Sequence, residues 1–289
     1  MEIELDLNKS LEENANIYFD KSKNLKNKII GAKNFLETSQ KKIKKYEKEV
    51  KTKYLNYNKQ WFEKFRYTIS ENGFLFIGGK DATSNEIIIK KHVLENEIVL
   101  HSSTPGSPFF VLNQDFDTFI KTNTKDLENC ANVLFNYSKA FDMDIFSGEV
   151  FYVKKEQVTK EAMSGEYMSK GSFMVYGNKN TIKTQLGFFL NILLIDDNFW
   201  EIFEKNQTSE FVKKIIEIFK IKKIEGKYYK IFSTSFNTND KQIKTFYINS
   251  GSKKKSEVSN LLMKKFNLFS NQDIISNLPN GNFSIKDMN

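Results

Sequence analysis

A long apolar seam near the amino terminus limits the possible folds of this chain more than any other sequence feature. From Leu11 to Val50, small or apolar residues recur at alternating steps of four and three, interrupted only by two serines. The seam consists of Leu11, Ala15, Tyr18, Ser22, Leu25, Ile29, Ala32, Leu36, Ser39, Ile43, Tyr46 and Val50. Lysine and glutamate flank these positions, so the pattern predicts a coiled-coil helix of roughly forty to fifty residues. A single helix cannot bury such a seam on itself, and no later segment has a similar length. We therefore expect a partner helix from outside this chain.

The two ends of this arm carry different signals. Residues 2–7 alternate acidic and apolar side chains, which predicts a short strand before a helix that begins near Asn8 or Ser10. Residues 40–59 contain eight lysines against two glutamates. Such a run is usually a solvated face, but on an arm directed at RNA it would neutralise phosphates.

Composition sets the outer limits. The net charge of +8 suits a polyanionic partner such as RNA, although a coding bias toward lysine would produce the same balance. The single cysteine, Cys130, excludes an internal disulfide framework and is typical of a reducing compartment. Residues 186–195 form the longest apolar run, which is too short to cross a bilayer. Because no signal peptide is visible either, we expect a cytoplasmic protein without a membrane partner.

Residues 61–92 combine several elements in a short stretch. Trp61, Phe62 and Phe65 are suited to anchoring a helix end on a core. Turn residues follow, and then Phe74–Ile77 is an apolar run of strand length. The pattern predicts a helix end, a turn and a strand that leads into a glycine hinge.

The hinge is followed by signals for a helix start. Gly78 and Gly79 allow close backbone approach, and either Asp81 as N-cap or Thr83 with Glu86 as a capping box begins the next helix. The neighbouring Lys80 and the first free amides of that helix would form a phosphate pocket. A well-capped structural turn explains the same residues equally well.

The remaining pattern predicts a mixed α+β fold. Strands are predicted at 97–100, 109–112, 149–153, 228–232 and 245–248, and helices at 127–141, 199–203 and 211–219. Residues 188–195 fit either a strand or a buried helix. Within the predicted helix 127–141, the side chains of Cys130, Val133, Leu134 and Tyr137 are expected to face inward. A last amphipathic helix follows the three lysines at 253–255, with Val258, Leu261, Leu262 and Phe266 inward.

Three segments resemble the RNA-binding module (NFACT-R) of the NFACT family, which includes RqcH and NEMF. They are EKFR at 63–66, FLFIGGKDATSNE at 74–86 and SGEYMSKGSFMVYG at 164–177. The resemblance divides the chain into a coiled-coil arm at 1–58, an NFACT-R domain at 59–182 and a carboxy-terminal α/β extension at 183–289. The family commonly has His-Ala-Asp followed by a glycine after the next strand. Here His101 and Gly106 are retained, while Ser102 and Ser103 replace the alanine and the aspartate.

The residues expected to contact RNA combine basic side chains with the hinge residues. Lysine and arginine meet phosphates, asparagine reads bases, and a glycine turn with lysines at a helix start suits a phosphate. The expected contacts are Arg66, Lys80, Asp81, Asn85, Lys90, Lys91, Lys154, Lys160, Lys170, Lys253, Lys254 and Lys255.

Catalytic motifs do not appear in the sequence. His92 and His101 are not spaced as metal ligands, and metal-binding HExxH and CxxC patterns and a phosphate-binding GxxxxGK[ST] loop are absent. Asp81 and Glu86 as metal carboxylates of a nuclease are the alternative, but helix capping explains them better. We therefore expect a binding protein with no metal, no cofactor and no catalytic residue.

The resemblance implies a role in ribosome-associated quality control. NFACT proteins bind large ribosomal subunits that are obstructed by peptidyl-tRNA, and recruit tRNA for alanine-type tailing of the stalled chain. The expected partners are therefore rRNA of the large subunit and tRNA. The family's outgoing coiled-coil helix lies in a part absent here, which implies a separate NFACT-N polypeptide as the partner of the seam. Self-dimerisation through the same seam is the competing structural hypothesis. A stand-alone nucleic-acid-binding module outside translation is the alternative function.

Overall fold

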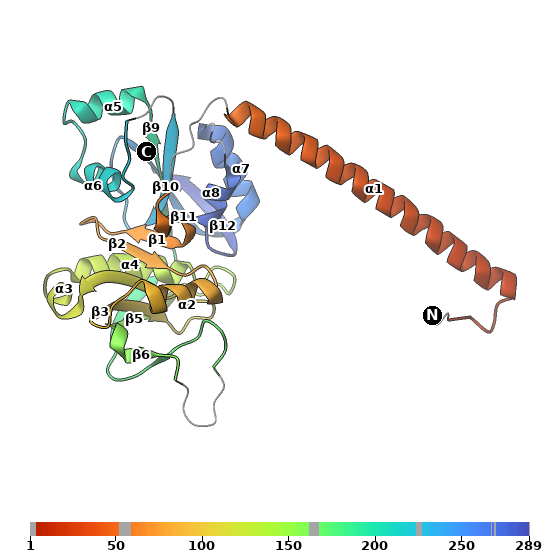
Figure 1. Cartoon of the computed structure of the whole chain (residues 1–289), viewed down its shortest axis with the longest axis horizontal. Coiled ribbons are helices and arrows are strands. Elements are labelled where there is room, and N and C mark those ends of the chain that lie inside the picture. Colours follow the sequence, from red (N-terminus) through yellow and green to blue (C-terminus); the bar gives the residue numbers. More distant parts are fainter. Residues whose placement is uncertain are drawn as a thin grey trace. The chain divides into compact units, whose positions relative to one another are not determined.

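The computed structural model describes residues 4–51, 59–161, 168–223, 227–266, 268 and 270–288, without the side chains of 42–51. The chain forms two compact units, Met1–Tyr54 and Leu55–Asn289 (Figure 1). Within the described residues, no helix is both long enough and apolar enough to span a bilayer.

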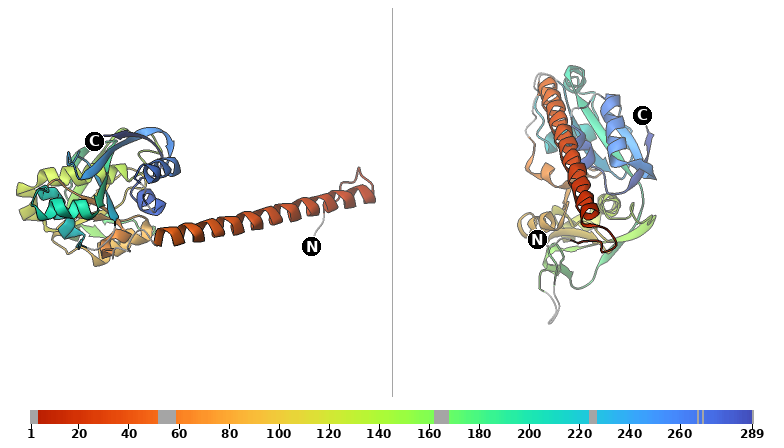
Figure 2. Two further views of the ribbon diagram at one scale, coloured as in Figure 1. Left: turned by 90° about the horizontal axis from the view of Figure 1, so that it is seen from above. Right: turned by 90° about the vertical axis from the view of Figure 1, so that its right-hand side faces the viewer.

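The first unit is built on one helix, α1 (Leu11–Lys51), which continues through Gly31 without a break (Figure 2). The helix begins where the sequence predicts, because Ser10 and Glu13 form a reciprocal cap. The Glu13 amide donates to Ser10 Oγ at 3.1 Å, and the Ser10 amide donates to Glu13 Oε2 at 2.7 Å. The strand predicted before the helix is wrong for its described residues, 4–7. This segment instead folds against the first turns, where Asn14 accepts the Asp6 amide and the Tyr18 hydroxyl donates to the Glu4 carbonyl.

The apolar seam of α1 is exposed within this unit. The side chains of Leu11, Leu25, Ile29 and Leu36 are more than half exposed, and Tyr18 is 38% exposed. Ala15 is exposed as well. Ile43, Tyr46 and Val50 lie on the helix, but their side chains are outside the described residues. The predicted long helix is confirmed, and its partner remains a prediction.

The second unit is organised around one large sheet. In the described part of the chain this sheet has ten strands. From one edge to the other they are β12 (Asn282–Asp287), β11 (Ile243–Lys254), β9 (Phe188–Ile195), β10 (Tyr228–Thr234), β1 (Arg66–Ile69), β2 (Leu75–Gly78), β4 (Phe110–Asp115), β3 (Glu97–Ser102), β5 (Ser147–Lys154) and β8 (Asn180–Gln185). Neighbouring strands are antiparallel except β1 and β10, which run parallel with Thr68 opposite Ser233. β6 (Val158–Thr159) and β7 (Met174–Val175) form a separate pair.

Helices cover both faces of the sheet and create two cores. One core contains side chains of α3 (Phe116–Thr122), α4 (Thr124–Asn136), α7 (Lys255–Phe266) and α8 (Asn271–Ser276). The other contains side chains of the 3-10 helix η1 (Trp61–Lys64), α2 (Ala82–Lys91), α5 (Asp197–Glu204) and α6 (Glu210–Ile218). A short 3-10 turn, η2 (Lys155–Gln157), follows β5. Successive strand residues alternate between the cores, so Phe76 packs into the first and Ile77 into the second.

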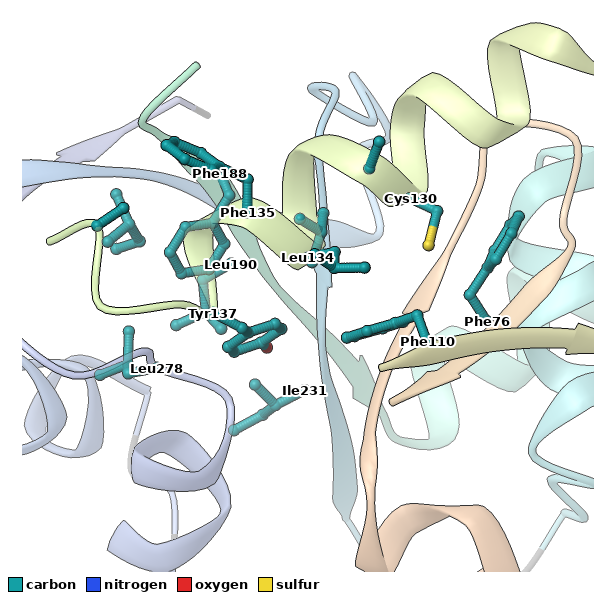
Figure 3. Close-up of a cluster of buried hydrophobic side chains, with 14 of the residues drawn as sticks. Phe76, Phe110, Cys130, Leu134, Phe135, Tyr137, Phe188, Leu190, Ile231 and Leu278 are labelled. Carbon is teal, nitrogen blue, oxygen red and sulfur yellow. The ribbon is translucent and has the colours of Figure 1, made fainter. Parts of the chain in front are cut away.

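Most predicted elements of this unit are confirmed, and the fold is α+β as expected. The predicted inward face of α4 is buried, and Figure 3 shows Cys130, Leu134 and Tyr137 in one cluster with Phe110. The ambiguous run 188–195 is the strand β9. The predicted domain boundary at residue 182 falls inside β8, and the sheet contains strands from both sides of it. The boundary stays a prediction.

Two inward-facing predictions are wrong. Phe62 and Phe65 are buried as expected, but the Trp61 side chain is 49% exposed. Leu261 is 42% exposed, because the inward face of α7 is formed by Val258 and Leu262.

Candidate nucleic-acid interface

The glycine hinge between β2 and α2 is fixed by close backbone contacts. The Gly79 amide donates to the Phe109 carbonyl at 3.1 Å, and Asn85 Oδ1 accepts the Phe109 amide at 3.2 Å. A Cβ atom on Gly79 would lie 1.9 Å from Asn85 Oδ1, so the hinge requires glycine at this position. Asn85 therefore ties α2 to β4, and its predicted contact with RNA remains a prediction.

The start of α2 is capped by its own side chains. Asp81 Oδ1 accepts the Ser84 amide at 2.8 Å, while Ser84 Oγ accepts the amides of Lys80 and Asp81. Hydrogen bonding from Ser84 holds the pKa of Asp81 below its ordinary value. The Asp81 N-cap is thus confirmed, and the Thr83–Glu86 capping box is wrong. The Ser84 amide is therefore already bonded within the chain, and the phosphate pocket predicted at this helix start stays a prediction.

Glu86 instead anchors a distant segment of the chain. Its Oε1 atom lies 2.8 Å from Lys160 Nζ and accepts the Gly171 amide at 3.1 Å, while Oε2 lies 3.3 Å from Lys90 Nζ. The hydrogen bond from Lys160 is the largest cause of the lowered pKa of Glu86. This contact fixes residues 168–173 beside α2, which brings Lys170 toward the hinge. Residues 164–167 of the motif at 164–177 lie outside the described residues.

Arg66 is the most unusual basic residue of this region. Its guanidinium carbon lies 4.1 Å from the centre of the Tyr137 ring. The ring is held by its hydroxyl, which lies 2.6 Å from Ser233 Oγ and donates to the Asn277 carbonyl at 3.1 Å. Among the described residues, nothing forms a hydrogen bond with Arg66 Nη1, although this atom is buried. A buried donor without a partner is costly, and an anionic oxygen placed beside it would remove that cost.

Arg66 lines a cavity of about 580 Å³, here called the basic cleft. The cleft is lined by Arg66, residues 79–82, Asn85, residues 101–109, Tyr137 and residues 170–173. Its basic side chains are Arg66, Lys80 and Lys170. The only acidic residue in this lining, Asp81, is already engaged with Ser84. The cleft therefore has the charge and the donors to receive a phosphate group.

Like charges crowd the region around Arg66. Burial, followed by repulsion from Arg66 and Lys59, lowers the pKa of Lys80. Burial and the charge of Arg66 lower the pKa of Lys255 to about 8, although Lys255 also donates to Asn280 Oδ1 at 3.2 Å. A bound anion would relieve this repulsion and favour the protonated lysines.

The loop 101–109 has a structural role at the edge of the cleft. His101 stacks on Phe109 with ring centres 3.8 Å apart, and its Nδ1 lies 2.9 Å from the Pro108 carbonyl oxygen. Burial lowers the pKa of His101 to about 4, so the imidazole is neutral at pH 7. The Ser102 hydroxyl donates to the Glu149 carbonyl at 2.7 Å.

The structure brings together only part of the predicted RNA-binding set. Arg66, Lys80, Asp81, Asn85 and Lys170 line the cleft, and Lys255 lies within electrostatic range of Arg66. The remaining predicted residues lie outside the lining. Lys90 and Lys160 both form ion pairs with Glu86, and Lys154 pairs with Asp117 at 2.7 Å. Lys91 is exposed at the end of α2, and Lys253 and Lys254 are exposed at the end of β11.

Sequence reasoning missed Tyr137 as a site residue. The helical period correctly places this ring in the core, but it carries no information about the cation above its face. Only the pairing of β1 with β2 and the packing of α4 on the sheet bring Arg66 to Tyr137.

The lowered pKa of Lys255 predicts a pH dependence of RNA binding. Since the pKa is about 8, the ammonium is largely protonated at pH 7 and is lost as the pH rises through 8 to 9. We expect RNA affinity, measured by fluorescence anisotropy at constant ionic strength, to fall by several-fold over this interval. Lys255→Arg keeps its charge and should flatten the decline. An equally steep decline in that variant would exclude Lys255 as its source.

Comparison with known proteins places this region in a family. Residues 64–177 match the model of the NFACT protein RNA binding domain. The archaeal Rqc2 homolog aRqcH of Methanocaldococcus jannaschii is 39% identical over 127 residues, which cover 42% of this chain and 18% of that protein. The ribosome quality control complex subunit NEMF homolog of Drosophila melanogaster is 31% identical over 209 residues, covering 69% of this chain and 21% of that protein. The Homo sapiens NEMF subunit is 32% identical over 174 residues, 58% of this chain and 16% of that protein.

The match is partial with respect to these relatives, because the chain spans about a fifth of their length. Among solved structures, the C-terminal part of the fibronectin/fibrinogen-binding protein from Streptococcus suis covers 61% of this chain and 76% of that one. It has 16% identity and a TM-score of 0.33, which does not establish a shared fold.

Proposed function

Because this chain carries the RNA-binding domain of the NFACT family, we propose that it binds RNA of obstructed large ribosomal subunits and acts in ribosome-associated quality control. The names of its relatives, which are ribosome quality control subunits and an Rqc2 homolog, support this role. The structural observation that carries the proposal is the buried Nη1 of Arg66, which has no hydrogen-bond partner among the described residues and lies in a cleft with Lys80 and Lys170.

The proposed binding mode is recognition of the phosphate backbone. A guanidinium presents a planar fork of donors that matches two phosphate oxygens, and stacking on Tyr137 fixes the plane of that fork. Lys80 and Lys170 would add charge that does not depend on the base sequence. The cleft then positions the RNA, and the ribosome performs any peptidyl transfer. The protein is accordingly proposed to be a binding factor and not an enzyme.

The finer parts of the role concern tRNA and a second polypeptide. We propose that the bound particle carries peptidyl-tRNA and that the complex recruits further tRNA for alanine-type tailing of the stalled chain. The exposed seam of α1, with Leu25, Ile29 and Leu36 each more than half exposed, is proposed to pair with a helix of a separate NFACT-N chain. A second copy of this chain is the competing partner. The proposed compartment is the cytoplasm.

Sedimentation with ribosomes tests the proposal directly. In sucrose gradients, the wild-type protein is expected to migrate with free large subunits. A variant with Lys42, Lys44, Lys45 and Lys48 changed to Glu should lose this association, because the change replaces four attractive charges with four repulsive ones. The fraction of protein in the subunit peak is the measurement.

A control variant distinguishes the effect of where the substituted lysines lie from the effect of the changed net charge. Lys121, Lys222, Lys241 and Lys264 are exposed residues of the second unit, and their change to Glu alters the net charge equally. This control variant should still sediment with large subunits. If the wild-type protein ignores ribosomes and binds DNA as readily as tRNA, the chain is a general nucleic-acid-binding module and the proposed function fails.

A further inference from the structure

Trp61 is exposed although its neighbours belong to the core. Its side chain is 49% exposed, whereas Phe62 and Phe65 are 4% and 3% exposed. The indole stacks on the His92 ring with centres 4.5 Å apart and planes 18° apart. Phe62 and Phe65 contact it edge-on, at 6.1 Å and 6.2 Å between ring centres. A large aromatic ring is thus supported on one side by described residues while half of its surface remains open to solvent.

The backbone that carries Trp61 is fixed. The Gln60 amide donates to Glu63 Oε1 at 2.6 Å, which caps η1, and Lys230 Nζ lies 2.6 Å from Glu63 Oε2. The Lys230 and Glu63 side chains are only 5% and 8% exposed. This buried ion pair attaches η1 to β10, and the contacts with His92, Phe62 and Phe65 support the ring itself. A fixed aromatic ring loses little conformational freedom when a ligand stacks on it.

The imidazole behind the indole is neutral at physiological pH. Burial, together with the charges of Lys64 and Lys91, lowers the pKa of His92 below its ordinary value. The indole and the imidazole therefore form an uncharged stack, and a flat ligand would meet the indole face that the imidazole does not cover.

Basic side chains lie beside this stack, together with the carboxylates of Glu63 and Asp273. Trp61 lines a cavity of about 470 Å³ together with Lys59, Lys64 and Lys80. Lys59 lies 2.9 Å from Asp273, and Lys64 lies 4.9 Å above the Phe65 ring. Lys80 lines both this cavity and the basic cleft, so the two cavities adjoin at that residue. An open aromatic face beside a line of basic side chains has the chemistry that recognises a base together with its phosphate.

We propose that Trp61 is a stacking platform for an unpaired nucleobase, whose adjoining phosphate lies against Lys80 at the mouth of the basic cleft. The inference rests on the proposed RNA binding and adds a selectivity to it. A base inside a duplex cannot present its face to Trp61, so this site favours single strands, loops and bulges over paired RNA.

Tryptophan fluorescence tests the platform, because the chain has two tryptophans and the other, Trp200, is 5% exposed. In the full chain carrying Trp200→Phe, Trp61 is the single reporter. We expect single-stranded oligouridylate to quench its emission. A blunt-ended RNA duplex with the same number of phosphates, and inorganic polyphosphate, should bind through charge with little quenching.

Affinity measurements supply the second readout. By anisotropy of a labelled oligouridylate, Trp61→Leu should weaken binding about tenfold, while Trp61→Phe, which keeps an aromatic face, should weaken it less. Neither change should weaken binding of the duplex. Phe146→Leu removes another exposed ring, 67% exposed and outside both cavities, and should leave both affinities unchanged.

The possible results separate the platform from RNA binding itself. If oligouridylate binds without quenching and Trp61→Leu binds as tightly as wild type, the platform is refuted while RNA binding stands. Equal quenching by the duplex also refutes it. If neither RNA binds the wild-type chain, the proposed function fails and the platform fails with it.

Discussion

Replacing Lys230 with Met is expected to lower the free energy of unfolding by about 3–5 kcal/mol. Lys230 and Glu63 form an ion pair with 2.6 Å between Nζ and Oε2, and both side chains are less than a tenth exposed. Burial lowers the pKa of Lys230 to about 8, which shows that its charge is held in a poorly solvated place. The substitution would leave the Glu63 carboxylate buried without its cation. Urea unfolding followed by circular dichroism measures the loss.

The double variant Lys230→Met with Glu63→Gln is the matched control. The amide removes the unpaired charge and keeps an oxygen for the Gln60 amide, so most of the lost stability should return. A single variant that loses less than about 1 kcal/mol would contradict the role of this pair as the attachment of η1 to the sheet.

Replacing Arg66 with Gln is expected to weaken RNA binding by at least about tenfold, since hydrogen bonds to a charged group contribute about 1.5–3 kcal/mol. The logarithmic dependence of affinity on salt concentration should become less steep by about one unit, because one phosphate contact is lost. The melting temperature should not fall appreciably. The buried Nη1 has no partner among the described residues, so its removal offsets the lost contact with Tyr137.

Two further variants make the Arg66 experiment specific. Arg66→Lys keeps the charge but loses the planar fork, so its affinity should lie between those of wild type and Arg66→Gln. Lys205→Gln removes a cation that pairs with Glu201 on α5, away from the cleft, and should bind RNA normally. Undiminished binding by Arg66→Gln, with an unchanged salt dependence, would remove the cleft from the proposed interface.

The elements that were predictable from the sequence are those whose signals are local. The heptad seam and the Ser10 cap predict α1, the helical period predicts the buried face of α4, and Asp81 begins α2 as its side chain suggests. The apolar run of β9 fitted either a strand or a helix, because a strand that is buried on both faces does not alternate apolar and polar residues. Trp61 was misplaced because composition does not tell a core ring from one that stacks at the surface.

The candidate site was only partly predictable, for a related reason. A lysine in a sequence looks the same whether it faces solvent, pairs with a carboxylate or lines a cavity. Lys154 and Lys160 prove to be paired with Asp117 and Glu86, whereas Lys80 and Lys170 line the cleft. Contacts between residues far apart in the chain decide which of these occurs. The stacking of Arg66 on Tyr137 is such a contact, and neither residue indicates it by itself.

The parallel pairing of β1 with β10 has a consequence for how this protein can be divided. The family match ends at residue 177, but the strand that completes β1 is contributed by residues 228–234. A fragment that stops where the family match stops would leave one side of β1 without a neighbour, and unpaired strand edges invite association with other chains. It would also lose Ser233 and Asn277, the two anchors of the Tyr137 hydroxyl beneath Arg66. The physical unit is therefore larger than the stretch that the family model matches, and the tail of the chain acts as scaffolding for the contact between Arg66 and Tyr137.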